Sequence, residues 1–212
     1  MIPAVVINLK RRPDRWASVS AHLAPLDFLH PLERCEAVEA QPPAAGCLLS
    51  HAQALRWARD RNWEQVMVLE DDVRFQPDAA LTLQALQAEL ANVSWNVLFG
   101  ASVRVRPRDL VSHSPHLLAL RTPQGLLTGT HCMLYHRRAY DLLIHLLETE
   151  AVDPHPFHLD LLLSSRCSNL YLAVPYLALF SEVDTSDVRV GRDTRIDYQN
   201  ILEAQALALR LI

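Results

Sequence analysis

The sequence predicts an α/β fold with a Rossmann-type, mostly parallel central sheet flanked by helices. Three short apolar runs, at residues 3–9, 66–69 and 95–99, have the length and near-continuous hydrophobicity of strands buried on both faces. Stretches with apolar residues at helical spacing separate these runs. Such strand–helix alternation over the first hundred residues is typical of a parallel, doubly wound sheet.

The first half of the chain divides into clear elements. The strand at 3–9 ends in a basic turn, and Pro13 suits the first turn of a helix because its missing N–H would be unbonded there. A second helix is expected over 46–61. The strand at 66–69 runs directly into three carboxylates, and a further helix is expected over 79–91 before the third strand.

The second half is less regular. Residues 103–124 carry charges, prolines and two histidines, and we expect loops or edge strands there. The other expected elements are a strand over 126–135 interrupted by Thr128-Gly129-Thr130, helices over 138–147, 159–163 and 196–211, and a strand over 170–174. Since no repeat or linker divides the chain, residues 1–212 are expected to form one domain.

Composition restricts the function and the compartment. The chain has 212 residues, half of them hydrophobic, and a formal net charge of −4, so nucleic-acid binding is not expected. Its four cysteines form no C-x-x-C pair and no disulfide framework. No basic residue precedes the first apolar run and no run approaches the ~18–20 residues that span a bilayer, so we expect a cytoplasmic protein.

Glu70, Asp71 and Asp72 are the most informative local feature. Ligands of open parallel sheets bind at the carboxyl ends of strands, where these residues lie. Because side chains alternate along extended backbone, Glu70 and Asp72 would project to one side and Asp71 to the other. Such a pair of hard oxygen ligands suits a divalent cation. A solvated acidic turn in which Asp72 acts as a cap explains the pattern equally well.

Two further segments carry candidate ligand-binding residues. The basic turn with Arg11, Arg12 and Arg15 follows the first strand, where guanidinium groups and a helix N-terminus can meet a diphosphate. Ser50 and His51, in the next helix, can contact a sugar or phosphate. The alternatives are a solvated basic face for the turn and a core histidine bonded to backbone for His51.

Together these segments resemble glycosyltransferase family 25, the bacterial lipooligosaccharide galactosyltransferases related to the animal collagen galactosyltransferases. The specific part of the resemblance is Val6-Ile7-Asn8-Leu9-x-Arg11-Arg12-x-Asp14-Arg15, Gly46-Cys47-x-x-Ser50-His51 and Val68-Leu69-Glu70-Asp71-Asp72-Val73. Looser matches are Trp95-Asn96-Val97-Leu98, Thr128-Gly129-Thr130, Asp160 and Ser186-Asp187-Val188. The chain departs from the family at His131-Cys132, where an aromatic residue is usual, and in its shorter length.

The resemblance implies a GT-A-like fold and an inverting transfer from a UDP-sugar, commonly UDP-galactose, with Mn²⁺ or Mg²⁺. Residues 1–100 would be the nucleotide-sugar-binding half and 101–212 the acceptor-side half. The implied metal ligands are Glu70 and Asp72. The implied donor-site residues are Asn8, Arg12, Arg15, Ser50, His51, Asp71, Thr130 and Asp187, although Asp187 fits an Asx-turn equally well.

An inverting transfer needs a general base on the acceptor hydroxyl. Asp160 is the candidate, because the matching family segment carries an acid there. Asp160 could instead cap the helix that begins near Leu161. A zinc site of His155, His158 and Asp160 is a weaker alternative, since no cysteine ligand is near.

Other functions stay open at this point. A metal-dependent nucleotidyl- or phosphotransferase would share the acidic strand end, but the chain has no P-loop and only five glycines. A non-catalytic glycosyltransferase-like module that binds nucleotide-sugars or scaffolds an assembly is a second alternative. The resemblance makes lipooligosaccharide the default acceptor, which would place the enzyme at the inner face of the cytoplasmic membrane, with the basic turn and Arg137-Arg138 as a peripheral contact.

Overall fold

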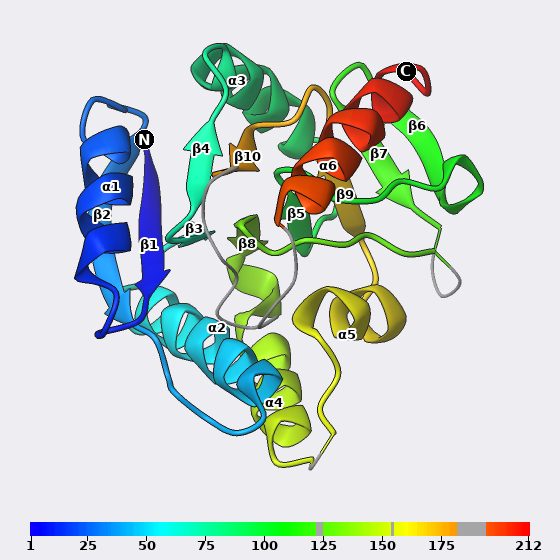
Figure 1. Cartoon of the computed structure of the whole chain (residues 1–212). Helices are drawn as coiled ribbons and strands as arrows, with labels where there is room; N and C mark the ends of the chain where they lie inside the picture. The colour runs from blue at the N-terminus through cyan, green and yellow to red at the C-terminus, as the bar shows by residue number, and fades with distance from the viewer. Residues whose placement is uncertain (122–124, 154, 182–193) are drawn as a thin grey trace.

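The computed structural model describes residues 1–121, 125–153, 155–181 and 194–212, and it confirms the predicted α/β fold class. The strands of the central sheet are β1 (Ile2–Asn8), β2 (Leu29–Glu36), β3 (Gln65–Glu70), β5 (Val97–Phe99), β6 (Leu110–Ser114), β7 (Leu117–Leu120), β8 (Cys132–His136) and β9 (Leu170–Ala173). Their order across the sheet is β2-β1-β3-β8-β5-β9-β7-β6 (Figure 1).

The sheet is mixed, with most strands running one way. Among the described residues, β2, β1, β3, β5, β9 and β6 share one direction, while β8 and β7 oppose them. β1, β2 and β3 form a parallel unit, of which the sequence predicts β1 and β3. The third predicted strand, β5, is separated from β3 by β8, which enters antiparallel from the second half of the chain. Strands from both halves therefore share one sheet.

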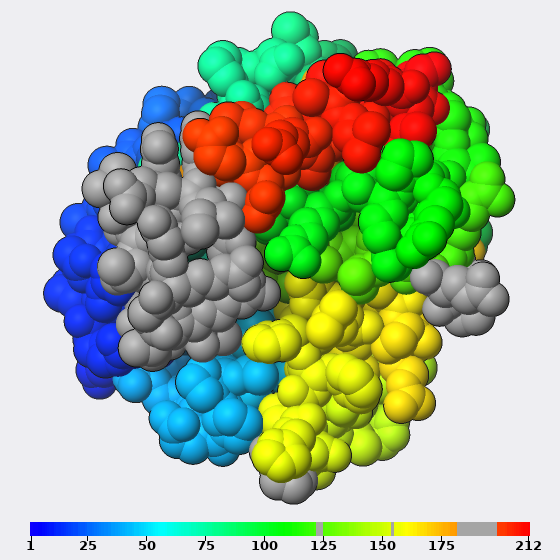
Figure 2. All heavy atoms as spheres, turned by 45° about the vertical axis from the view of Figure 1, so that its right-hand side comes forward, coloured from blue at the N-terminus to red at the C-terminus, as the bar shows by residue number. Residues whose placement is uncertain are grey.

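Helices cover both faces of this sheet. On one face, strand residues such as Val5 and Val68 pack with α2 (Pro43–Asp60), α4 (Tyr140–Ala151), α5 (Leu159–Arg166) and α6 (Thr194–Leu209). On the other face, Ala4 and Val6 pack with α1 (Pro13–Leu23) and α3 (Ala79–Leu90). A two-stranded sheet of β4 (Val73–Phe75) and β10 (Ala178–Phe180) lies on this second side. Figure 2 shows α6, in orange and red, across the surface next to the green β6–β7 region.

Local sequence explains how the elements near β1 and β3 begin and end. Pro13 is the first residue of α1, as predicted, and Pro43 begins α2. Gly46 lets the first turns of α2 approach the preceding loop, because a Cβ there would collide with the Val38 carbonyl oxygen and lie 3.2 Å from the Ala40 nitrogen. The loop at 37–42 is thereby held against the helix.

The remaining predictions differ from the structure in detail. The polar segment Leu29–Glu36, to which no element was assigned, is strand β2. The strand expected over 126–135 begins only at Cys132, after a bend in which Gly129 has a φ of +100°. Residues 103–124 contain a 3₁₀ turn (Pro107–Asp109) and the edge hairpin β6–β7, which confirms the expected loops and edge strands. Of the helices described, none combines the length and the apolarity that crossing a bilayer requires.

Candidate functional site

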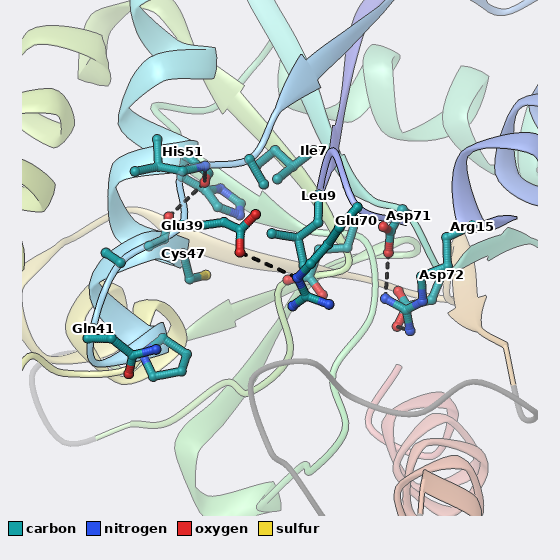
Figure 3. Close-up of a pocket in the computed structure, with 17 residues that line it drawn as sticks. Ile7, Leu9, Arg15, Glu39, Gln41, Cys47, His51, Glu70, Asp71 and Asp72 are labelled. Carbon is teal, nitrogen blue, oxygen red and sulfur yellow. Dashed lines mark hydrogen bonds and ion pairs between the residues drawn. The ribbon is translucent and has the colours of Figure 1, made fainter. Parts of the chain in front are cut away.

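A pocket of about 590 Å³ opens at the carboxyl ends of β1 and β3 (Figure 3). One side is largely apolar and comes from the end of β1, the loop at 37–43 and the first turns of α2. The other side carries the charges of Arg15 and of the three carboxylates at 70–72. The pocket therefore lies where an open α/β sheet binds its ligands.

Asp71 is held by a buried network on this charged side. Its Oδ1 accepts a hydrogen bond from Arg15 Nη1 at 2.6 Å, and its Oδ2 accepts one from Asn8 Nδ2 at 2.6 Å. The Asn8 side-chain oxygen accepts from Arg34 Nη2, also at 2.6 Å. Burial raises the pKa of Asp71, while Arg15 and Asn8 offset part of that rise. Both oxygens of Asp71 are thus engaged within the protein.

Glu70 faces a different set of neighbours. Its Oε1 accepts a short hydrogen bond from the hydroxyl of Thr130, in the bend before β8. Burial and the neighbouring Asp72 charge raise the pKa of Glu70 well above its usual range. The predicted alternation holds only in part, because β3 ends at Glu70 and the chain turns. Asp72 therefore lies beside Arg15, on the same side as Asp71. The distance from Asp72 Oδ2 to Arg15 Nη2 is 3.8 Å.

The donor set around Glu70 and Asp72 fits a divalent cation. Arg15 lies 2.6 Å from Asp71 and 3.8 Å from Asp72, so Asp71 takes its closest ion pair. Repulsion between Glu70 and Asp72 is one cause of the raised pKa of Glu70, and a bound cation would relieve it. Carboxylate oxygens are the ligands that Mg²⁺ and Mn²⁺ prefer.

Ser50 and His51 both line the pocket, yet their polar atoms bond to the protein. The Ser50 hydroxyl donates to the Gly46 carbonyl oxygen at 2.6 Å and accepts from the Val38 N–H at 2.8 Å. His51 Nδ1 lies 3.0 Å from the Tyr135 hydroxyl. Burial lowers the pKa of His51 to about 3, so its imidazole is neutral. Ser50 therefore ties the loop at 37–43 to α2.

His51 keeps one ring nitrogen unbonded. Its Nε2 is buried and has no hydrogen-bond partner among the described residues. One helical turn earlier, the thiol of Cys47 also lines the pocket, and burial together with the charges of Glu70 and Asp160 raises the pKa of this thiol. The Cys47 thiol and one ring nitrogen of His51 lie within 4.8 Å of each other and of a Glu70 carboxylate oxygen.

The basic turn contributes differently from the prediction. Arg15 is buried and central, whereas the Arg12 side chain pairs with Asp14 at 2.9 Å and does not line the pocket. Arg11, which the predicted donor-site set omits, does line the pocket and lies 3.4 Å from Glu39. Arg11 therefore borders the pocket although its side chain is 52% exposed, whereas that of Arg12 is 18% exposed.

Asp160, the predicted general base, bonds to backbone on both oxygens. Oδ2 accepts from the Gly129 N–H at 3.0 Å and Oδ1 from the Leu161 N–H at 2.9 Å. Asp160 is buried and is not among the residues that line the pocket. His158, not Asp160, is the N-cap residue of α5. The carboxylate thus supports the Thr128–Thr130 bend, and through it the Thr130 contact to Glu70.

The other predicted site residues are the zinc-site alternative and Asp187. Among the described residues, His155, His158 and Asp160 do not gather into a metal-binding group, so the zinc-site alternative is wrong there. Asp187 lies outside the described residues. Sequence reasoning also missed Arg34 and Tyr135, which reach Asn8 and His51 from distant strands. No local pattern marks either residue, since only the sheet brings them to the site.

Comparison with known proteins supports the family resemblance. Residues 42–104 match the model of glycosyltransferase family 25, described as an LPS biosynthesis protein, and this match confirms the resemblance over that segment. The chain is also similar to a Bos taurus protein named probable inactive glycosyltransferase 25 family member 3, with 33% identity over 78 residues. That match covers 35% of this chain and 13% of the length of the cattle protein.

Solved structures with a partly similar arrangement include three transferases. A glycosyltransferase involved in glycosylating the major capsid of PBCV-1 has 11% identity and a TM-score of 0.48, covering 72% of this chain and 68% of that one. A mannose-1-phosphate geranyltransferase from Thermus thermophilus has 13% identity and a TM-score of 0.48, covering 85% and 75%. An inositol-1-phosphate CTP transferase from T. maritima has 15% identity and a TM-score of 0.45, covering 93% and 76%.

Proposed function

We propose that this chain, which carries a glycosyltransferase family 25 segment over residues 42–104, transfers a sugar from a UDP-sugar to a glycan with inversion at the anomeric carbon. Galactose is the sugar that the family resemblance favours. The observation that carries the proposal is the acidic end of β3, where Glu70 and Asp72 border a pocket of about 590 Å³ next to the buried Arg15. Pockets of this size suit a nucleotide-sugar.

The donor would lie along the first half of the chain. All residues that line the pocket fall between Ile7 and Asp72, which agrees with residues 1–100 forming the nucleotide-sugar-binding half. Arg11 and Arg15 can meet the negative diphosphate. The apolar side, with Leu9 and Val38, offers contact surface to the nucleoside. Asn8 and Asp71 keep Arg15 in place rather than touching the donor themselves.

A divalent cation is proposed at Glu70 and Asp72, with Mn²⁺ and Mg²⁺ as the candidates. When bound, this cation would neutralise negative charge on the departing UDP. Thr130 holds Glu70 in orientation, and Asp160 holds the bend that carries Thr130. We therefore propose that Asp160 is a positioning residue rather than the acceptor base.

The acceptor and its location follow from the family alone. Lipooligosaccharide is the proposed acceptor, reached at the inner face of the bacterial cytoplasmic membrane. Arg137 and Arg138, both exposed beside α4, could contribute a peripheral contact to anionic lipid. Vesicle flotation of the wild type against Arg137→Gln/Arg138→Gln tests that contact, and unchanged flotation would contradict it.

A non-catalytic nucleotide-sugar-binding module is the second candidate function. The similar cattle protein carries the word inactive in its name, which favours this reading. A metal-dependent nucleotidyltransferase would use the same acidic strand end. The three functions differ in product, since only sugar transfer releases UDP from a UDP-sugar and only nucleotidyl transfer releases diphosphate from a nucleoside triphosphate.

The deciding experiment measures UDP release from a panel of UDP-sugars with Mn²⁺. We expect release with one preferred donor and a fall of roughly 10²-fold or more in Asp72→Asn, because a ligand to the cation is lost. Asp78→Asn is the matched control, since Asp78 is exposed at the start of α3 and outside the pocket. Activity that survives in Asp72→Asn would remove the metal proposal, and binding without release would favour the non-catalytic module.

A further inference from the structure

Cys47, His51 and Glu70 form a compact group of metal-ligand side chains on one wall of the pocket. One ligand atom from each residue lies within 4.8 Å of the others. Cys47 and His51 are four residues apart on α2 and so share one face of the helix. Glu70 ends β3 opposite them, and Figure 3 shows it between α2 and the Asp71–Asp72 side of the pocket.

The His51 ring is oriented as a metal ligand needs to be. Its Nδ1 bonds the Tyr135 hydroxyl at 3.0 Å, which leaves Nε2 as the free ring nitrogen. This Nε2 is buried, and among the described residues no group satisfies it. A buried nitrogen without a partner is costly unless something binds it. Ligating histidines commonly use their second nitrogen for such an orienting hydrogen bond.

The surroundings are accessible and negative. Cys47 and Glu70 are both partly exposed and line the pocket, so an ion can enter from solvent. Glu70 also contributes a negative charge at the pocket wall. A cation that binds the Cys47 thiol removes the thiol proton.

We propose that Cys47 Sγ, His51 Nε2 and the Glu70 carboxylate bind a thiophilic divalent cation, with Zn²⁺ as the expected ion. Two ligands of a tetrahedral Zn²⁺ lie roughly 3.3–3.7 Å apart. The three ligand atoms lie within 4.8 Å of one another, so rotation of the side chains has to bring them closer by about 1 Å. Binding forms the Zn–S bond and releases the Cys47 proton to solvent. Water completes the fourth position, as in open three-ligand sites. The thiol selects Zn²⁺ over Mg²⁺ and Mn²⁺, which prefer oxygen.

This site is distinct from the cation proposed at Glu70 and Asp72, although both use Glu70. The two ions would compete for one carboxylate. Binding measured without donor and without Mn²⁺ therefore tests the thiophilic site on its own. If no metal bound at Cys47, His51 and Glu70, the proposal of sugar transfer would still stand. If no sugar were transferred, the proposal of this metal site would still stand.

The test is titration of the metal-free wild type with Co²⁺, followed by displacement with Zn²⁺. We expect one equivalent of Co²⁺ to give thiolate-to-cobalt charge-transfer absorption, which Zn²⁺ then removes. Absence of that band in the folded wild type would overturn the proposal without any variant. Zn²⁺ affinity is measured in parallel by competition with a chromophoric chelator.

Variants assign the ligands. Cys47→Ser should abolish the charge-transfer band, and His51→Gln should weaken Zn²⁺ binding at least as much as the roughly 10–100-fold that loss of an orienting partner costs. Tyr135→Phe, which removes only that partner, should fall within this range. Cys35→Ser is the matched control, because Cys35 is buried in β2 and belongs to no metal-ligand group among the described residues. A band that persists in Cys47→Ser or disappears in Cys35→Ser would refute the assignment.

Discussion

At the scale of single residues, the ion pair between Arg15 and Asp71 combines short distance with nearly complete burial. The two side chains are 8% and 6% exposed, and Nη1 lies 2.6 Å from Oδ1. Asn8 bonds the second carboxylate oxygen, so the carboxylate is fully coordinated by the protein. Removing one partner from such a pair leaves a buried charge without compensation, which costs more than the pair itself contributes.

We predict that Arg15→Met lowers the free energy of unfolding by about 3–5 kcal/mol. The physical reason is the uncompensated charge of Asp71, whose carboxylate would keep only the Asn8 hydrogen bond. Urea unfolding monitored by circular dichroism measures the change. Arg59→Met is the control, because the Arg59–Asp141 pair is largely exposed and such pairs contribute ~1 kcal/mol or less. Equal losses in both variants would contradict the buried-pair account.

Acid sensitivity is predicted for His131. Burial lowers its pKa from 6.5 to about 4, so the unfolded chain takes up a proton before the folded chain does. The stability linked to His131 is therefore complete above pH 6.5 and is lost as the pH falls from 6.5 to 4. The loss is on the order of 3 kcal/mol.

His131→Gln isolates this effect from other titrating groups. Urea unfolding of both proteins from pH 7.5 to pH 4 should give a shallower decline for the variant. The difference at pH 7.5 reports the cost of altered packing, because His131 is neutral in both states there. Parallel declines in the two proteins would show that His131 does not contribute to acid sensitivity.

At the scale of elements, the sequence predicts those whose pattern is local. The strand before Glu70 and the helix from Pro13 follow from short apolar runs and from proline at a helix start. β2 escapes prediction because its exposure alternates poorly and because it pairs with residues far away in the sequence: Glu33, for example, pairs with Val5. An edge strand of this kind is specified by its neighbour rather than by its own hydrophobicity.

The same distinction separates the predicted from the missed site residues. Asn8 and the carboxylates at 70–72 end strands, where an open sheet places its ligands, and both are in the site. Arg34 and Tyr135 act through contacts across 26 and 84 residues of sequence. Arg11 lines the pocket and Arg12 does not, and the basic run by itself does not indicate which of the two side chains will do so.

Ser50 links two elements, and its removal should show this. In Ser50→Ala the Val38 N–H loses its acceptor at 2.8 Å, and the loop at 37–43 loses its tie to α2. We expect a loss of about 1–3 kcal/mol in stability, the cost of an unsatisfied buried donor. Because Val38 and Pro43 line the pocket, donor affinity should fall as well.

Ser20→Ala provides the comparison, since the Ser20 hydroxyl bonds only the Ala17 carbonyl within α1 at 3.2 Å. That variant should stay within about 0.5 kcal/mol of the wild type. Urea unfolding and calorimetric donor titration measure the two effects. Normal donor affinity in Ser50→Ala, despite lower stability, would show that the loop does not shape the donor pocket.

At the scale of the whole molecule, the chain brings strands from both halves into one sheet. β8 inserts antiparallel between β3 and β5, and its approach, residues Thr128–His131, meets Glu70 at the pocket. The sequence does not predict this insertion, because the hydrophobic pattern of a short buried strand is the same whether the strand pairs parallel or antiparallel. A ligand that binds at Glu70 therefore contacts a sheet to which both halves of the chain contribute strands.

Donor and cation together should therefore stabilise the molecule as a unit. At a UDP-sugar concentration 100 times its dissociation constant, with Mn²⁺ present, the gain is about 2.7 kcal/mol. For a domain of this size that corresponds to a rise in Tm of roughly 5–11 °C. Differential scanning calorimetry should show one transition that moves as a whole.

The cation dependence of this shift decides between ways of binding the donor. If Glu70 and Asp72 hold the cation that meets the diphosphate, a chelator should abolish most of the shift and Asp72→Asn should reproduce that loss. Asp78→Asn should keep the full shift, because Asp78 lies outside the pocket. An equal rise in Tm with chelator would mean that Arg11 and Arg15 bind the diphosphate without a cation. A larger rise with a nucleoside triphosphate than with any UDP-sugar would instead favour nucleotidyl transfer at the same strand ends.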